Sequence, residues 1–145
     1  GTTARYLANG RPRAVTLPAT ADWSPGPVAA KAVRVKAGGP LVLPGVGDFE
    51  RDKPFTVAAW VQIPNRGQYG GIVARMDDEK AGYRGWDLWL DNDKFAVHLV
   101  NTWPDNALKV QTKTNFNPNN WYHVAATSDG TGTAAGVRIY VNGEL

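Results

Sequence analysis

The sequence contains no cysteine among its 145 residues. This absence excludes a disulfide framework, a thiolate zinc site and haem attachment through a cysteine motif. No run approaches the ~18 consecutive apolar residues of a membrane-spanning helix. The first ten residues (GTTARYLANG) also lack the basic and then apolar order of a signal peptide. We therefore expect a soluble chain that does not insert into a membrane and is an excised piece of a longer one.

Serine and glutamate, two common catalytic residues, are scarce. The two serines, Ser24 and Ser128, do not lie in a G-x-S-x-G nucleophile elbow. The three glutamates, Glu50, Glu79 and Glu144, lie in or beside predicted loops, and no strand carries an E-x-D-x-E pattern. These absences argue against an enzyme.

Basic residues are only slightly in excess. Lys and Arg number 16 against 13 Asp and Glu, and the basic residues are scattered singly, as in KAVRVK. A nucleic-acid interface gathers its cations on one face. We therefore expect no nucleic-acid partner.

Glycine (16) and proline (10) are abundant and separate short apolar runs, while no 12-residue stretch keeps a helical period. This profile predicts an all-β sandwich or barrel. We interpret residues 1–27 as an N-terminal arm or first edge strand, with an irregular connection over residues 21–30. Nine antiparallel strands are expected after it, at 31–36, 40–43, 54–63, 70–76, 84–91, 94–101, 107–113, 121–128 and 135–141.

The segment RGWDLWLDNDKFAVHLVN (84–101) predicts a hairpin with a two-residue turn at Asn92 and Asp93. In that register, positions whose numbers sum to 185 lie opposite each other. One face then collects only large apolar side chains, from Trp86, Leu88, Leu90, Phe95, Val97 and Leu99. A slip of one residue would mix apolar and polar positions, so the pattern fixes the register.

The other face of this hairpin pairs Asp87 with His98 and places Trp89 diagonal to His98. The loops 77–83 (DDEKAGY) and 102–106 (TWPDN) must lie at the same end of the sheet, because hairpin strands are antiparallel.

A series of segments resembles a laminin G-like module of the concanavalin A-like lectin/glucanase superfamily: FTVAAWVQIP, GGIVAR, WDLWLDNDKFAVHL, NNWYHVAATSDG and VRIYVNGEL. The resemblance covers residues 28–145. More narrowly, IVARMDDEKAGYRGWDLWL with NTWPDNALKV resembles the version in bacterial multidomain proteins that contain c-type cytochrome domains.

The resemblance implies two antiparallel sheets packed as a jelly-roll sandwich, with Trp60 and Trp121 buried. It also implies an extracytoplasmic, usually non-catalytic module beside other domains of the same polypeptide. Such modules continue beyond the YVNG turn. We therefore expect the sandwich to be incomplete at its C-terminus unless residues 1–30 supply substitute strands, and its edge to be exposed.

A carbohydrate site needs an aromatic face and a few polar groups for hydroxyls. The candidates are Trp89, Trp103, Asp87, His98, Tyr83 and Asn101. A calcium ion held at the loop rim by Asp77, Asp78 and Asp105 is a further possibility, because family relatives often hold calcium there and carboxylates suit this ion. No other cofactor is expected.

Three functions remain open at this stage. The first is a recognition module that binds glycan or a protein surface, and the second is a structural spacer without a ligand. The third, a glycoside hydrolase built on Asp87 and Asp91, is only a remote alternative, because the carboxylates lack the catalytic pattern and are better interpreted as a solvated pair. Asp87 opposite His98 also resembles part of a catalytic triad, but no serine or cysteine lies nearby.

Overall fold

The computed structural model describes residues 1–77 and 79–145. Within these ranges the chain forms eleven β-strands and two short 3-10 turns, η1 (Glu79–Ala81) and η2 (Ala134–Gly136). The expected all-β class is confirmed. No helix in the described ranges is long and apolar enough to cross a membrane. The chain divides into two compact units, Gly1–Asp48 and Phe49–Leu145.

Unit 1 (Gly1–Asp48) consists of two β-hairpins. Asn9 and Gly10 both have positive φ (52° and 73°), which suits a two-residue turn whose twist matches the flanking strands. Two antiparallel pairs result, β1 (Thr3–Ala8) with β2 (Arg11–Thr16) and β3 (Ala21–Ser24) with β4 (Ala32–Val35).

The structure corrects two predictions in this unit. The segment expected to be an irregular connection contains β3, whose Asp22 lies opposite Arg34 of β4. Residues 40–43 were expected to form a strand but do not, and Pro40 and Pro44 remove hydrogen-bond donors at both ends of that run. The strand predicted at 31–36 exists as β4 and pairs with β3. The predicted domain boundary at residues 27 and 28 lies in the loop between these two strands.

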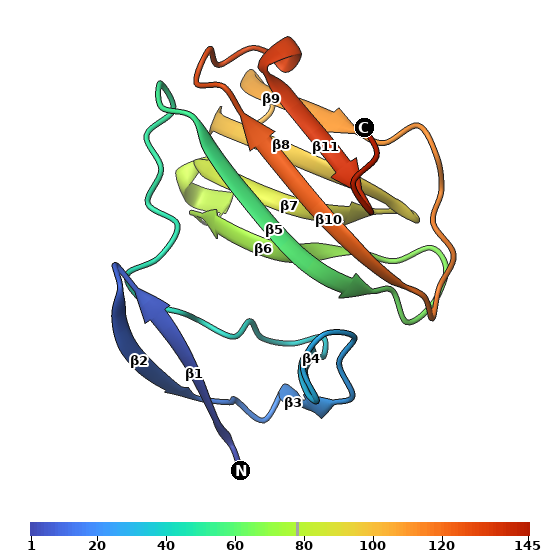
Figure 1. The fold of residues 1–145 in the computed structure, drawn as a ribbon. Helices are drawn as coiled ribbons and strands as arrows, with labels where there is room; N and C mark the ends of the chain where they lie inside the picture. Colours follow the sequence, from blue (N-terminus) through green and yellow to red (C-terminus); the bar gives the residue numbers. More distant parts are fainter. Residues whose placement is uncertain (78) are drawn as a thin grey trace. The chain divides into compact units, whose positions relative to one another are not determined.

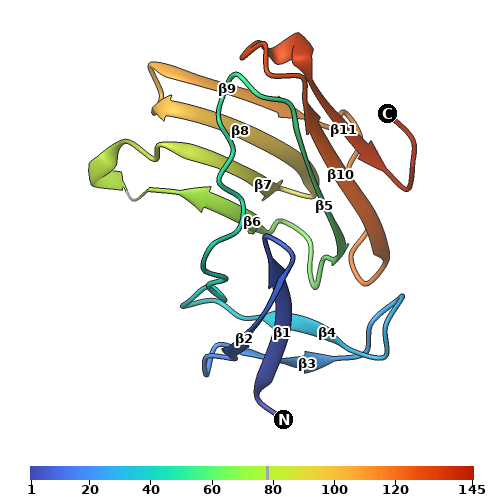
Figure 2. The same cartoon turned by 60° about the vertical axis from the view of Figure 1, so that its left-hand side comes forward.

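Unit 2 (Phe49–Leu145) contains the two-sheet sandwich (Figure 1). One sheet has the order β11-β10-β5 and the other β6-β7-β8-β9, and every neighbouring pair is antiparallel. Figure 2 shows the four strands of the second sheet side by side. The strands are β5 (Phe55–Gln62), β6 (Tyr69–Met76), β7 (Gly85–Asp91), β8 (Lys94–Thr102), β9 (Asn106–Gln111), β10 (Trp121–Ser128) and β11 (Val137–Val141).

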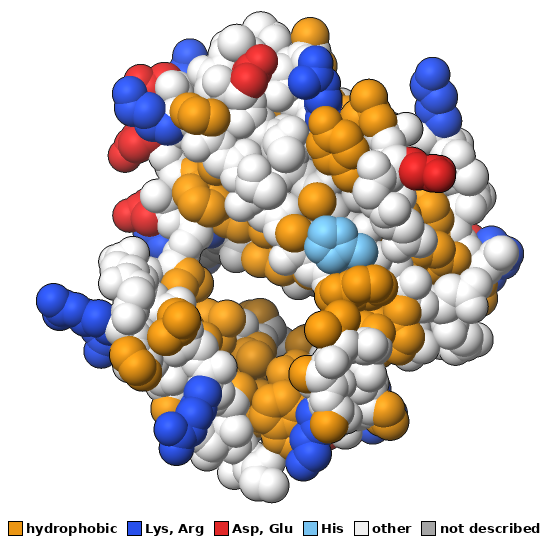
Figure 3. Space-filling view, viewed as in Figure 1, with side chains coloured by type: hydrophobic (Ala, Val, Ile, Leu, Met, Phe, Trp, Pro, Cys, Tyr) orange, Lys and Arg blue, Asp and Glu red, His pale blue; other side chains and the backbone are white. Residues whose placement is uncertain are grey.

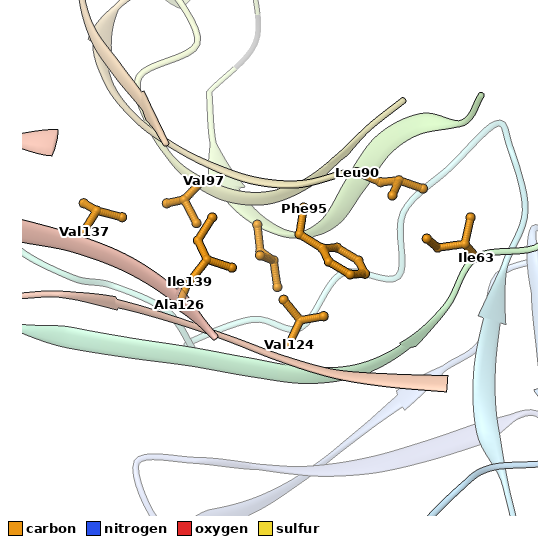
Figure 4. Packing of buried hydrophobic residues seen from close by; sticks show 9 residues of the cluster. Ile63, Leu90, Phe95, Val97, Val124, Ala126, Val137 and Ile139 are labelled. Carbon is orange, nitrogen blue, oxygen red and sulfur yellow. The ribbon is translucent and has the colours of Figure 1, made fainter. Parts of the chain in front are cut away.

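The core lies between the two sheets of unit 2 (Figure 4). Leu88 and Phe95 from the four-stranded sheet are completely buried, as is Val124 from the three-stranded sheet. Phe95 also packs against Phe116, with ring centroids 4.8 Å apart. A fully buried large apolar side chain stabilises the fold by roughly 1.5–3 kcal/mol relative to exposure, so this layer holds the two sheets together.

The predicted register of the β7–β8 hairpin is confirmed. Asn92 and Asp93 have φ values of 48° and 70°, and Asp87 pairs with His98 as expected. The predicted apolar face is buried at Trp86, Leu88, Leu90, Phe95 and Val97, and Leu99 packs partly buried against the same core.

We predict that acid weakens the β3–β4 hairpin through Asp22. The guanidinium of Arg34, and then the ammonium of Lys36, hold the pKa of Asp22 well below its usual range; the ion pairs measure 2.7 Å and 2.8 Å. A carboxyl with a lower pKa in the folded state stabilises that state above its unfolded pKa of about 3.9, and this contribution is lost as pH falls toward the folded pKa.

An NMR titration of the Asp22 carboxyl should therefore give a midpoint below about 3.9. In the Asp22→Asn variant, the signals of β3 and β4 should lose the part of their acid sensitivity that comes from this group. A midpoint at the usual value for aspartate would contradict the prediction.

Candidate ligand-binding face

The outer face of the four-stranded sheet is the side that points away from the core. Cross-strand partners share a face, so side chains form rows across β6, β7, β8 and β9. Three of these rows contain the polar and aromatic side chains of this face: Tyr69, Asp91 and Lys94; Gly71, Trp89, Ala96 and Gln111; and Ala74, Asp87, His98 and Lys109. The middle of the sheet therefore presents two aromatic rings, Trp89 and His98, in neighbouring rows.

Asp87 holds His98 in place. The carboxylate oxygen Oδ1 of Asp87 accepts a hydrogen bond from the backbone N–H of His98 at 3.0 Å, and it lies 2.8 Å from Nδ1 of the same residue. Asp87 is only 3% exposed. Its carboxylate therefore has little access to a ligand and acts by positioning the imidazole ring.

The ring of His98 contacts two tryptophans. Its centroid is 6.2 Å from that of Trp89, at an interplanar angle of 77°. The centroid of the Trp103 ring lies 5.7 Å from that of His98, at 86°. Both contacts have the edge-to-face geometry that aromatic rings prefer. We call Trp89, His98 and Trp103 the Trp–His–Trp cluster.

The cluster is accessible at its outer end and along one flank. Trp103 is 46% exposed. Trp89 has small neighbours on both sides of its row, Gly71 on β6 and Ala96 on β8. A Cβ added at Gly71 would lie 4.0 Å from Cε3 of Trp89. Gly71 therefore has no side chain to cover the adjacent edge of the indole, and Trp89 is partly buried.

The loops at one end of the sheet come together as the antiparallel geometry predicts. The backbone N–H of Trp103 donates a hydrogen bond to the carbonyl of Gly82 at 2.9 Å. Tyr83 follows Gly82 with a positive φ of 56° and is exposed. Asn101 is exposed beside a register shift in β8, and no ring contact or hydrogen bond joins its side chain to the cluster within the described residues.

Residues 36–145 match a laminin G-type family model, which is described as the concanavalin A-like lectin/glucanases superfamily. The chain belongs to this superfamily. Neither the curated proteins nor the solved structures include a significant match. The laminin G-like members of the superfamily are generally non-enzymatic, although its fold also includes glycosidases.

Asp87 and Asp91, the candidate glycosidase pair, are both engaged with neighbouring side chains. Asp87 contacts His98, and Asp91 forms an ion pair with Lys109. Ser128 lies on β10 of the other sheet and not beside the Asp87–His98 pair.

The calcium ligands predicted at the loop rim do not form a metal-holding group in the described part of the chain. There, no cluster of three or more His, Asp or Glu side chains stands close enough to bind a metal ion. Asp77 and Asp105 belong to this part, whereas Asp78 lies outside the described residues. Calcium at this rim stays a prediction of the sequence.

The structure corrects the prediction that Trp60 is buried, which came from the resemblance to the superfamily. Trp60 is 46% exposed on the outer face of the three-stranded sheet. Its ring lies 5.4 Å from that of His123 on β10, and Figure 3 shows a histidine among hydrophobic side chains on this face. Alternation along β5 carried the signal, because Trp60 shares its parity with the exposed Thr56 and Gln62. Trp121 is partly buried.

We predict that Asp87→Ala destabilises unit 2 by about 1–3 kcal/mol, because the contacts of the buried carboxylate with the backbone N–H and Nδ1 of His98 are lost. Asp87→Asn should cost less, since an amide oxygen can still accept the bond from the backbone N–H. Guanidinium unfolding curves of both variants measure the difference. Asp105→Ala, at an exposed loop position, is the control and should change stability by less than about 0.5 kcal/mol. Equal stability of the Asp87→Ala variant and the parent chain would contradict the positioning role.

Proposed function

We propose that this chain is a non-catalytic recognition module that binds carbohydrate on the outer face of its four-stranded sheet. The observation that carries the proposal is the Trp–His–Trp cluster, in which the exposed Trp103 and the accessible flank of Trp89 are held around an anchored imidazole. Aromatic surfaces flanked by a few polar groups suit the apolar faces and hydroxyls of sugar rings.

The rigidity of the cluster supports this proposal. His98 is fixed by two contacts to Asp87, and Trp89 lies on the central strand β7, between β6 and β8. Groups that are already ordered before binding lose less conformational entropy when a ligand arrives. In a spacer without a ligand, a solvent-exposed tryptophan would contribute little to stability. The exposed Trp103 therefore favours recognition over a purely structural role.

The setting of the module is part of the same proposal. We infer that it works outside the cytoplasm, within a multidomain polypeptide of the bacterial type that its sequence resembles. Membership of the superfamily supports this, because its laminin G-like members are typically extracellular. A protein surface is the second candidate ligand, and the exposed Trp60 beside His123 favours it.

Substitution of the two tryptophans tests carbohydrate binding. We predict that Trp103→Ala weakens binding to the glycans retained on a glycan array by at least tenfold, which corresponds to about 1.4 kcal/mol. Trp89→Ala should do the same if its circular dichroism shows that it folds. Trp60→Ala, on the other sheet, is the matched control and should bind normally. Loss of binding only in Trp60→Ala would move the site to the three-stranded sheet.

A pair of glycine variants tests the flank of Trp89 without removing any aromatic ring. Gly71→Val places methyl groups against the indole edge at ordinary contact distance, and we predict weaker glycan binding. Gly70→Val is the control, because Gly70 pairs with Leu90 on the opposite face and an added Cβ meets no atom within 4 Å. Unchanged binding in Gly71→Val would show that the ligand does not approach this flank.

A further inference from the structure

A shallow pocket lies on the outer face at the end where the β7–β8 hairpin turns. Its volume is about 260 Å³, and its lining consists of side chains with hydroxyl, amide, carboxylate or ammonium groups: Tyr69, Asp91, Asn92, Lys94, Gln111 and Asn115. Pockets for drug-sized ligands span about 300–1,000 Å³, so this one suits a group about the size of one sugar ring. Lys94, Gln111 and Asn115 were not among the candidates from the sequence.

The pocket is continuous with the Trp–His–Trp cluster. Asp91 follows Trp89 by two positions on β7, a distance of about 7 Å along the strand. Gln111 lies in the same row as Trp89, since both residues flank Ala96. One extended ligand can therefore contact the pocket and the cluster together.

The walls of the pocket are held by backbone contacts. The N–H of Asn92 donates to the carbonyl of Gln68 at 3.0 Å, and that of Thr112 donates to the carbonyl of Phe95 at 2.9 Å. The first bond fixes the β7–β8 turn, which supplies Asn92. The second fixes the segment after β9, which supplies Asn115. The pocket is therefore formed before a ligand arrives, as most small-molecule sites are.

The charges in the pocket do not balance. The carboxylate of Asp91 is paired with Lys109, which reaches it across β8. The ammonium of Lys94 forms no ion pair within residues 1–77 and 79–145. Lys94 thus leaves one uncompensated positive charge beside the amide groups of Gln111 and Asn115.

We propose that this pocket is a subsite for an acidic sugar unit, one that carries a carboxylate or a sulfate. Its anionic group pairs with Lys94, its hydroxyls bond to the amides of Gln111 and Asn115, and its ring packs against Tyr69, which is 64% exposed. The inference rests on the proposed carbohydrate function and narrows it to an anionic glycan whose next units lie over Trp89 and Trp103.

Calorimetric titration with two matched pairs of tetrasaccharides tests the proposal. One pair is tetragalacturonate and its methyl ester, and the other is sulfated cellotetraose and cellotetraose. We expect an acidic member to bind at least tenfold more tightly than its neutral counterpart, with a preference that weakens as salt is raised. The pair that shows the preference identifies the anionic group as carboxylate or sulfate.

Lys94→Gln should remove this preference, so that the acidic and neutral members of a pair bind with equal affinity. Lys53→Gln, at an exposed lysine elsewhere in unit 2, is the charge-matched control and should retain the preference. Asn115→Ala should weaken binding of every tetrasaccharide that binds the parent chain. An equal preference for acidic sugar in the Lys94→Gln variant would overturn the proposal.

The remaining outcomes separate this inference from the proposed function. Equal binding of neutral and acidic sugars, lost in Trp103→Ala, would reject the acidic subsite and keep the carbohydrate function. Binding that depends on Lys94 but not on either tryptophan would support the acidic subsite in the pocket. It would reject the Trp–His–Trp cluster as a part of the binding site. No binding of any of the four tetrasaccharides would overturn both.

Discussion

The two-residue turn at Asn92 and Asp93 is the constraint on which the sandwich and its candidate site depend. Both residues have positive φ, which sets the pairing of β7 with β8. Because side chains alternate between the two faces of a strand, a slip of one residue would exchange the core set and the outer set. Asp93 also holds the neighbouring segments, since its carboxylate accepts from the N–H of Gly67 at 2.9 Å and its carbonyl from that of Phe116 at 2.7 Å.

This register places core side chains on the inner face of the four-stranded sheet and the candidate binding residues on its outer face. The inner side chains, such as Leu88 and Phe95, are completely buried against the second sheet. Their close packing fixes the backbone that carries Trp89 and His98 on the other side. The candidate site therefore draws its rigidity from the core, and a binding face on central strands needs no ordering of loops at its centre.

The polar residues of the outer face divide between support and recognition. Asp87 is buried by its contacts with His98, and a buried carboxylate needs such partners because desolvation is costly. Lys109 neutralises Asp91 in the same way. What remains for a ligand is an exposed indole, an exposed phenol, several amides and the ammonium of Lys94. That composition suits a polyhydroxylated, anionic partner better than a second apolar surface.

The sequence by itself determined the all-β class, the β7–β8 register and the side of the sheet on which Trp86 and Trp89 lie, because alternation and turn chemistry are local. It also determined that Asp87 faces His98. The tertiary structure alone decided that Asp87 is buried, that Trp103 reaches His98, and that Tyr69, Lys94 and Asn115 line one pocket. The pocket joins segments as far apart in the chain as residues 69 and 115, and the burial and ring contacts depend on side-chain packing, which alternation along one strand does not show. The alternation of side chains along β5 indicates an exposed Trp60, whereas the family resemblance implied a buried one. In the structure Trp60 is exposed.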